Sequence, residues 1–482
     1  DADSGPQVLP ALEDDVGGQA PGPLSLRPEG LQTHRSSEIA DLFDPGRVQS
    51  TTPQSASSQD DPWWLNRPTV PTPNTATLDT PIFSSTDVNI GSDEEVYFFL
   101  EDYSQVGHAE GTYGWYRMLS SSEAPSPTFS NYGTIVAQSA GSIYVSATGT
   151  STERYKNSTD DPVIWRNEVG GSIYADNLLP LNYAAGIYVS AWTNVTNAGL
   201  IQSTAESASG IVSASTTWFT NESTGVVRVW GGTLSARGVV AATADNAGLI
   251  EVSSRSTYSS VGIMETSDVK NSGTIRVHTE FVGERIGWDI GVLHPDNIVN
   301  SGTIDAEIAV WFDHQWGVLD NSGSIYGDIL GGGIITNSGL ISGDLHFGDY
   351  STEYDGSSGH LFGSLYLGRG KNTVQLGSND DAVLSHDGGE NTISTGGGHD
   401  IIDVISGTLA LDGGDGIDLL TFEFLQSGAV QVDLTSGTVA GSVTGTVQNV
   451  EAVAGSMADD WLRGSSNKEF LFGGNGTDSL YG

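Results

Sequence analysis

Glycines and aspartates recur at a fixed spacing near the end of the chain, in segments that could coordinate a cation. Residues 413–421 read GGDGIDLLT and residues 473–481 read GGNGTDSLY, and the sixth residue of each segment is an aspartate. Glycine-rich turns expose backbone carbonyl oxygens, and a carboxylate adds charged oxygens. Calcium prefers about six to eight hard oxygen ligands of these kinds, so the pattern predicts calcium binding.

The same nine-residue frame continues on both sides of these two segments. Its blocks begin at Gly377, His386, Thr395, Val404 and Gly413, and again at Gly455, Gly464 and Gly473. The eighth position of every block is leucine or isoleucine: Leu384, Ile393, Ile402, Leu411, Leu420, Leu462, Leu471 and Leu480. One apolar residue per block predicts short strands stacked around a thin core.

This repeat resembles the Gly-Gly-x-Gly-x-Asp-x-(Leu/Ile)-x repeat of RTX proteins, the hemolysin-type calcium-binding proteins that bacteria export by type I secretion. The resemblance covers residues 370–482 and implies a calcium-binding β-roll with two blocks per coil. Turns on one side are then 18 residues apart, as Asp400 is from Asp418 and Asp460 from Asp478. The resemblance implies that these four aspartates are calcium ligands. It also implies carbonyl ligands from Gly396, Gly398, Gly414, Gly416, Gly474 and Gly476.

Other parts of this array depart from the motif. Asn391 and Glu469 replace the aspartate, whereas Ala382 and Leu409 remove it, so we do not assign calcium to those turns. An alternative stays open for the two good pairs, in which the glycines only form tight turns and the aspartates only cap them. Residues 422–454 interrupt the array and predict a few antiparallel or edge strands. Because Gly482 would begin another block, we expect a further segment or a partner over that edge.

A longer repeat precedes the nonapeptides and predicts a parallel β-helix over residues 130–369. The pentapeptide Asn-x-Gly-x-Ile begins at positions 131, 197, 246, 271, 300, 321 and 337. A second signature, glycine followed by β-branched or apolar residues, begins at positions 186, 210, 238, 262, 291 and 317. Asparagine and glycine tolerate left-handed corners, and asparagines of successive coils can hydrogen-bond in a ladder. The fold class is therefore all-β, a solenoid of stacked coils followed by the β-roll.

The beginning of the chain has a different composition. Twelve of the 17 prolines lie before residue 82, which predicts an extended arm over residues 1–95 and an entry or capping segment over 96–129. Trp63 and Trp64 stand together in polar surroundings. They indicate that the arm docks on its own body or on a neighbouring subunit, and a flexible linker with incidental aromatic residues is the alternative.

Charge excludes several classes of partner. The chain has 60 acidic and 18 basic residues, a formal net charge of −42. Nucleic acid and anionic membranes would be repelled, whereas cations would be attracted. The absence of cysteine excludes disulfides and thiolate metal sites. We find no apolar run long enough to span a bilayer, so no membrane insertion is predicted.

Enzyme motifs are absent from the sequence. It contains no His-Glu-x-x-His, no Gly-x-Ser-x-Gly, no P-loop and no dinucleotide-binding fingerprint. One segment, 278–316, is dense in residues that could abstract a proton or hold a sugar. These residues are His278, Glu280, Glu284, Arg285, Asp289, His294, Asp296, Asp313 and His314, with Trp288, Trp311 and Trp316 able to stack on sugar rings. The Tyr-Gly-Phe-Asp-Pro-His run of alginate epimerases is missing, and we predict no enzyme and no catalytic residues.

These observations together favour a secreted protein, extracellular or on the cell surface, that calcium folds after export. Its plain coils are similar to those of filamentous adhesins, which share this style of repeat. We expect a structural or adhesive role in a surface layer, filament or matrix, with self-assembly into a homo-oligomer or polymer and a cell-surface glycan as a candidate partner. The alternative is a carbohydrate-active β-helix enzyme, of the polyuronate lyase or epimerase kind, joined to an RTX module.

Overall fold

The computed structural model of the protein describes most of the chain after residue 127 and four short stretches before it. The described residues are 82–84, 88–90, 95–100, 116–119, 128–139, 147–153, 163–177, 183–189, 193–213, 217–256, 258–264, 266–280, 287–331 and 333–482. Within these ranges every regular element is a β-strand, and none of them contains a helix able to cross a membrane. The predicted all-β class is confirmed. Trp63 and Trp64 lie outside the described residues.

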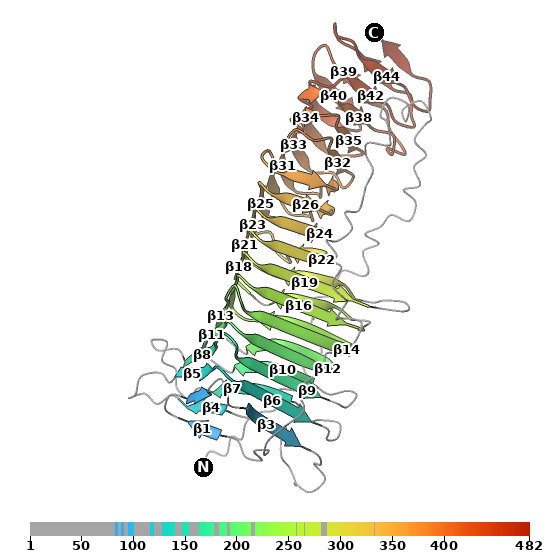
Figure 1. The fold of residues 1–482 in the computed structure, drawn as a ribbon. Helices are drawn as coiled ribbons and strands as arrows, with labels where there is room; N and C mark the ends of the chain where they lie inside the picture. The colour runs from blue at the N-terminus through green and yellow to red at the C-terminus, as the bar shows by residue number, and fades with distance from the viewer. Residues whose placement is uncertain are drawn as a thin grey trace, which may run out of the picture. The chain divides into compact units, whose positions relative to one another are not determined.

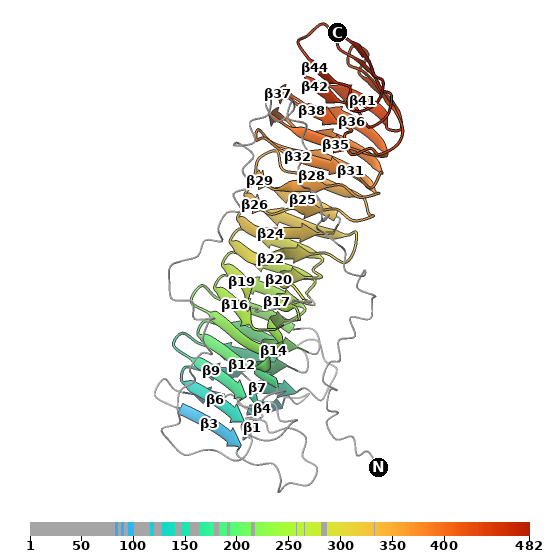
Figure 2. The same ribbon diagram turned by 90° about the vertical axis from the view of Figure 1, so that its right-hand side faces the viewer.

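The strands stack in three parallel ladders, and up to β29 one coil of chain contributes a strand to each ladder in turn (Figures 1 and 2). Four long strands run through both ladder 1 and ladder 2: β12 (Leu200–Ser213), β14 (Val226–Val240), β22 (Thr303–Trp311) and β24 (Ser324–Leu330). The other strands of ladder 1 are β3 (Glu95–Leu100), β6 (Thr134–Ser139), β9 (Ser172–Asn177), β16 (Leu249–Ser254), β19 (Thr274–Thr279), β26 (Leu340–Ser342) and β29 (His360–Phe362).

Ladder 2 extends from the first to the last coil. Its remaining strands are β1 (Ile82–Ser84), β4 (Tyr116–Leu119), β7 (Ala147–Glu153), β10 (Tyr183–Val189), β17 (Ser260–Met264), β20 (Asp289–Leu293), β27 (Leu345–His346), β30 (Ser364–Tyr366), β32 (Ala382–Ser385), β35 (Ile401–Val404), β38 (Leu419–Thr421), β42 (Ala452–Ala454) and β44 (Phe470–Phe472).

Ladder 3 forms the opposite face of the coils. It contains β2 (Val88–Ile90), β5 (Thr128–Asn131), β8 (Val163–Asn167), β11 (Thr193–Asn197), β13 (Thr217–Asn221), β15 (Thr243–Asn246), β18 (Asp268–Asn271), β21 (Asn297–Asn300), β23 (Gly317–Asn321), β25 (Gly333–Asn337), β28 (Thr352–Asp355), β31 (Lys371–Gln375), β33 (Glu390–Ser394), β36 (Thr408–Asp412), β41 (Thr444–Gln448), β43 (Trp461–Arg463) and β45 (Ser479–Tyr481).

The ladders change character near residue 363. Ladder 1 ends at β29, and from β30 onward each coil alternates between ladders 2 and 3 only. The change falls within the stretch where the long repeat gives way to the nonapeptides. At the other end, β1 and β2 lie inside the predicted arm and already pair with β4 and β5. The ladders therefore begin earlier than the Asn-x-Gly-x-Ile repeat indicates.

Nine buried asparagines form the ladder expected from the pentapeptide. Each side-chain Nδ2 donates to the Oδ1 of the next member at 2.7–2.8 Å, through Asn131, Asn167, Asn197, Asn221, Asn246, Asn271, Asn300, Asn321 and Asn337. None is more than 1% exposed. Asn167 and Asn221 begin no pentapeptide and were found only from the structure. The ladder satisfies amide groups that burial would otherwise leave unpaired.

Glycines of the second signature mark where ladders 1 and 2 approach each other. A Cβ at any of them would lie 2.3–2.7 Å from a carbonyl oxygen of the next coil and 2.4–2.8 Å from a ladder 1 side chain. These glycines are Gly186, Gly210, Gly238, Gly262 and Gly291. Gly317 differs, because it opens β23 in ladder 3, and Ala309 follows Gly291 in the stack.

The nine-residue frame is correct for most coils of the array but is shifted by one residue at its start. Ile393, Ile402, Leu411, Leu420 and Leu462 are 0–3% exposed and lie in the core, whereas Leu480 on the last strand is 48% exposed. The core position of β32 belongs to Val383, which pairs with Ile402, and not to Leu384. The turn between Val383 and Ile393 is one residue longer than the frame requires.

The 422–454 insertion contains two additional strands next to β41. β39 (Val430–Asp433) and β40 (Thr438–Gly441) pair antiparallel, and β40 pairs antiparallel with β41. β39 then pairs in parallel with β43. The insertion therefore prolongs ladder 3 without interrupting ladder 2, where β38 pairs directly with β42.

Replacing Asn246 by alanine tests the asparagine ladder. The change removes the shortest hydrogen bond of the Asn221 amide group and the Asn246 donor to the Asn271 side-chain oxygen, so we expect the free energy of unfolding to fall by roughly 2–4 kcal/mol. Urea unfolding followed by circular dichroism measures it. Asn297→Ala is the control, because Asn297 bonds Asp268 at an exposed site. Equal losses for the two variants would contradict the role of the ladder.

Candidate functional site

Three aspartates stack at the turn that enters ladder 2 in the two-strand coils. Asp381, Asp400 and Asp418 immediately precede β32, β35 and β38. The backbone N–H of Asp381 donates to Oδ1 of Asp400 at 2.8 Å, and that of Asp400 donates to Oδ1 of Asp418 at 3.0 Å. The Asp418 N–H donates to Oε2 of Glu451 at 3.1 Å. The column thus has one buried carboxylate per coil.

The second oxygen of each carboxylate has no hydrogen-bond partner. Oδ2 of Asp381, Asp400 and Asp418 is buried and unsatisfied, and the residues are only 0–5% exposed. Burial raises the pKa of all three carboxyl groups to about 7. An uncompensated buried carboxylate is costly, so this column is suited to a compensating positive charge.

Asp381 was missed by the sequence-based assignment, which placed Ala382 at this position. The one-residue shift of the frame explains the error, since β32 aligns Ala382 with Ile401 and therefore Asp381 with Asp400. The signal was present in Val383, the apolar residue two positions after Asp381. A frame anchored on Val383 instead of Leu384 would have placed Asp381 in the column.

The glycine turns beside Asp400 and Asp418 require glycine. Gly396, Gly398, Gly414 and Gly416 have φ angles of +89°, +127°, +91° and +149°. An added Cβ at any of them would lie 1.6–2.2 Å from a carbonyl oxygen of the preceding coil. The turns also pair through β34 (Gly397–Gly398) and β37 (Asp415–Gly416). Consecutive turns are thereby held in register, and the Gly396 carbonyl oxygen accepts from the Asp415 N–H at 2.8 Å.

Asp460 and Asp478 also lie on consecutive coils, but on the other side of the roll. They precede β43 and β45 of ladder 3, and the Asp460 N–H donates to Oδ1 of Asp478 at 2.9 Å. Both oxygens of Asp460 are already hydrogen-bonded, Oδ1 to the Val430 N–H at 2.7 Å and Oδ2 to the Ser456 N–H at 2.5 Å. This pair has less need of a cation than the three-aspartate column.

One of the two turns in this second pair lacks glycine at the two positions that have a positive φ in the other. Gly474 and Gly476 have φ angles of +88° and +112°. They stack on Ser456 and Ala458, neither of which has a positive φ. The two turns therefore differ in backbone conformation. The predicted ligand residues are brought together here, but only one of the turns has the glycine-rich form.

The turns without aspartate use their polar residues locally. Asn391 donates to Oγ of Ser385 at 2.8 Å and accepts from Asn372 at 2.8 Å. Glu469 accepts from the Ser465 N–H at 3.1 Å. Within the described ranges, no three histidine, aspartate or glutamate side chains group as a metal centre. A cation at the aspartate column would therefore take most of its ligands from backbone carbonyl oxygens.

The cluster predicted between residues 278 and 316 divides between two corners. Glu284 and Arg285 lie outside the described residues. At the corner between β19 and β20, Asp289 accepts from the Thr279 N–H at 2.8 Å, and Oε2 of Glu280 lies 3.8 Å from Nη2 of Arg255. His278 is exposed at the same corner.

The second corner joins ladder 2 to ladder 3, after β20 in one coil and after β22 in the next. Here Nε2 of His314 lies 2.9 Å from Oδ1 of Asp296, and Nδ1 of His294 lies 3.7 Å from Oδ2 of Asp313. Nδ1 of His314 accepts from the backbone N–H of Trp316 at 3.2 Å. Both ring nitrogens of His314 are engaged, which suits an orienting role better than proton abstraction.

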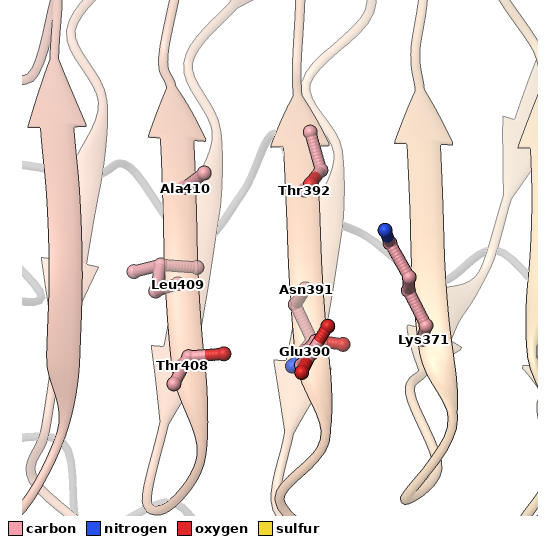
Figure 3. Close-up of a pocket in the computed structure, with 7 residues that line it drawn as sticks. All are labelled: Lys371, Glu390, Asn391, Thr392, Thr408, Leu409 and Ala410. Carbon is pink, nitrogen blue, oxygen red and sulfur yellow. The ribbon is translucent and has the colours of Figure 1, made fainter.

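A separate hollow of about 280 Å³ lies on the outer face of ladder 3 (Figure 3). Lys371, Glu390 and Thr408 occupy one row across β31, β33 and β36. The complete lining is Lys371, Glu390, Asn391, Thr392, Thr408, Leu409 and Ala410. The hollow includes none of the four predicted calcium-binding aspartates and no second acidic side chain.

The buried aspartates make stability in chelator depend on pH. Each binds its proton more tightly in the folded state, because its pKa rises from 3.8 to about 7 on folding. Their stabilising contribution is therefore complete below pH 3.8 and is lost as the pH rises through about 7. We expect a lower urea midpoint at pH 8 than at pH 5. Asp400→Asn should weaken this dependence, and the exposed Asp245→Asn should preserve it. A wild-type midpoint that rises over this range would contradict the assignment.

Comparison with known proteins adds no relative. No family model matches the chain, and no match is found among curated proteins or solved structures.

Proposed function

We propose that the protein binds calcium at the column of Asp381, Asp400 and Asp418. The observation that carries this proposal is the set of three stacked carboxylates, each buried with one oxygen unpartnered. Carbonyl oxygens of Gly396, Gly398, Gly414 and Gly416 would supply further ligands. The resemblance of these turns to RTX repeats supports the same assignment.

The donor set favours calcium over other metals. It consists of carboxylate and carbonyl oxygens, which are hard ligands, and the chain contains no cysteine. Magnesium requires near-octahedral geometry and usually retains several waters, whereas calcium accepts irregular sets of oxygens. Asp460 and Asp478 would form a weaker second site, because Ser456 and Val430 already satisfy Asp460.

Calcium would act mainly on folding. A ligand that binds only the folded chain stabilises it in proportion to the logarithm of its concentration over the dissociation constant. The net charge of −42 opposes compaction where calcium is scarce. Ordering of the two-strand coils after export would follow from calcium in the extracellular medium. This is the basis for proposing a secreted or cell-surface protein exported by type I secretion.

The three-strand coils suit a structural or adhesive role. Their strands are parallel and regular, and the described corners between them are short. Solenoids of this kind provide long surfaces for assembly or contact. We therefore propose a homo-oligomeric or polymeric element of a surface layer, filament or matrix. We do not favour the carbohydrate-active enzyme, because the divided 278–316 cluster offers His314 only with both nitrogens engaged.

Calcium titration of aspartate variants tests the binding site. Isothermal titration calorimetry of the full chain should detect calcium binding, and Asp400→Asn or Asp381→Asn should weaken it by about tenfold or more, since each removes a charged ligand. Asp460→Asn should have a smaller effect, and Asp245→Asn none. Unchanged binding in both Asp400→Asn and Asp381→Asn would remove the column from the site.

Assembly is a separate prediction. Light scattering and negative-stain microscopy should show dispersed chains in chelator and ordered polymers or sheets after addition of millimolar calcium. The control is magnesium at the same concentration and ionic strength, which should not produce them. Chains that fold with calcium but remain monomeric would refute self-assembly and leave calcium binding intact.

A further inference from the structure

Trp316 is unusually exposed. Its exposed fraction is 74%, the highest among the large apolar side chains in the described part of the chain. It ends the corner between β22 and β23, which begins at Phe312, a core residue that is 3% exposed. A large aromatic face left in water at a defined corner is suited to a ligand with an apolar face of its own.

The corner also holds the backbone of Trp316 through one hydrogen bond. The backbone N–H of Trp316 donates to Nδ1 of His314 at 3.2 Å. Nε2 of that ring therefore carries the proton that is donated to Asp296 at 2.9 Å. This chain of contacts joins the corner to the one that follows β20. Because the backbone of Trp316 is ordered before any ligand arrives, binding does not have to order it.

Polar side chains lie in the same corner as Trp316 and in the corner of the preceding coil. The side chains of Asp296 and Asp313 are 57% and 48% exposed, so they retain acceptor oxygens for a ligand. His294 lies opposite Asp313 and has a φ of +54°, one of two positive φ values among the described non-glycine residues. Strained backbone of this kind is often retained at functional sites.

We propose that the corner formed by Asp296, Asp313, His314 and Trp316 binds a neutral glycan. The C–H face of a pyranose ring would stack on the indole of Trp316, and its hydroxyl groups would donate to Asp296 and Asp313. The inference gives a partner to the proposed adhesive function and rests on that function for its biological meaning. It does not depend on calcium binding.

Charge selects a neutral glycan over an acidic one. Two carboxylates, those of Asp296 and Asp313, belong to the proposed site, and the chain as a whole has a net charge of −42. A polyuronate or a sulfated glycan would be repelled by both. The hydroxyl groups of a neutral sugar are instead donors that match the carboxylate acceptors.

A second aromatic residue extends the same corner along the solenoid. Tyr350, 46% exposed, lies in the corner between β27 and β28, two coils beyond the corner of Trp316. Adjacent strands lie about 4.8 Å apart, so two coils correspond to about 10 Å along the ladders. A linear oligosaccharide lying along the coils could contact both rings.

The test is binding of neutral oligosaccharides to the full chain in calcium-containing buffer. Cellohexaose, laminarihexaose and mannohexaose are titrated by calorimetry, with polyguluronate as the acidic comparison. We expect at least one hexaose to bind, and Trp316→Ala to weaken that binding by about tenfold or more through loss of the stacking surface. Trp218→Ala, which removes another exposed tryptophan on β13, is the matched control and should bind as the wild type does. Urea unfolding confirms that both variants are folded.

Two results would overturn the proposal. One is that no hexaose binds, or that only polyguluronate does. The other is a hexaose affinity that is the same in Trp316→Ala as in the wild type. Asp296→Asn provides a further check, since it should weaken binding while keeping the size of the side chain. Failure of glycan binding leaves the calcium titration unaffected, and loss of calcium binding in Asp400→Asn should leave hexaose binding unchanged, so the two proposals fail separately.

Discussion

The three-strand coils depend on the pairing of buried amide groups at one corner. A corner that turns away from a ladder leaves polar groups inside the protein, and each unpaired group carries a cost. The asparagine ladder removes that cost by joining each coil to the next at 2.7–2.8 Å. Stacking is then required for each coil to be stable, and coil spacing and strand register follow from it.

The same constraint explains how much of the fold could be predicted. Seven pentapeptides were enough to identify a solenoid, because asparagine, glycine and isoleucine occupy equivalent corner positions. Asn167 and Asn221 escaped notice because the glycine equivalent to that of the pentapeptide, Gly171 or Gly225, comes two residues later in their corners, NEVGG and NESTG. Strands β1 to β4 were missed for a related reason. These strands are defined by their pairing with strands that are distant in the sequence, and a local sequence pattern does not indicate such pairing.

The candidate site was predictable to a similar degree. The spacing of Asp400 and Asp418 correctly placed them on adjacent coils, and the glycines of their turns have positive φ angles. Asp381 was lost through a shift of one residue, which moves a side chain to the other face of a strand. The hydrogen bonds to both oxygens of Asp460 could not be foreseen, because they come from the N–H groups of Val430 and Ser456. Val430 belongs to an insertion whose strand pairing the repeat does not define.

The asparagine ladder also gives the solenoid an electrical direction. Every member donates toward the C-terminal coils, and the last, Asn337, donates to the carbonyl oxygen of His360. Parallel amide dipoles, each about 3.5 D, add along a common axis as they do in an α-helix. The strands themselves contribute little net dipole. The asparagine ladder therefore has its positive pole toward the coils that contain the buried aspartates. An isolated coil would lack this asymmetry, and the asymmetry grows with every coil added.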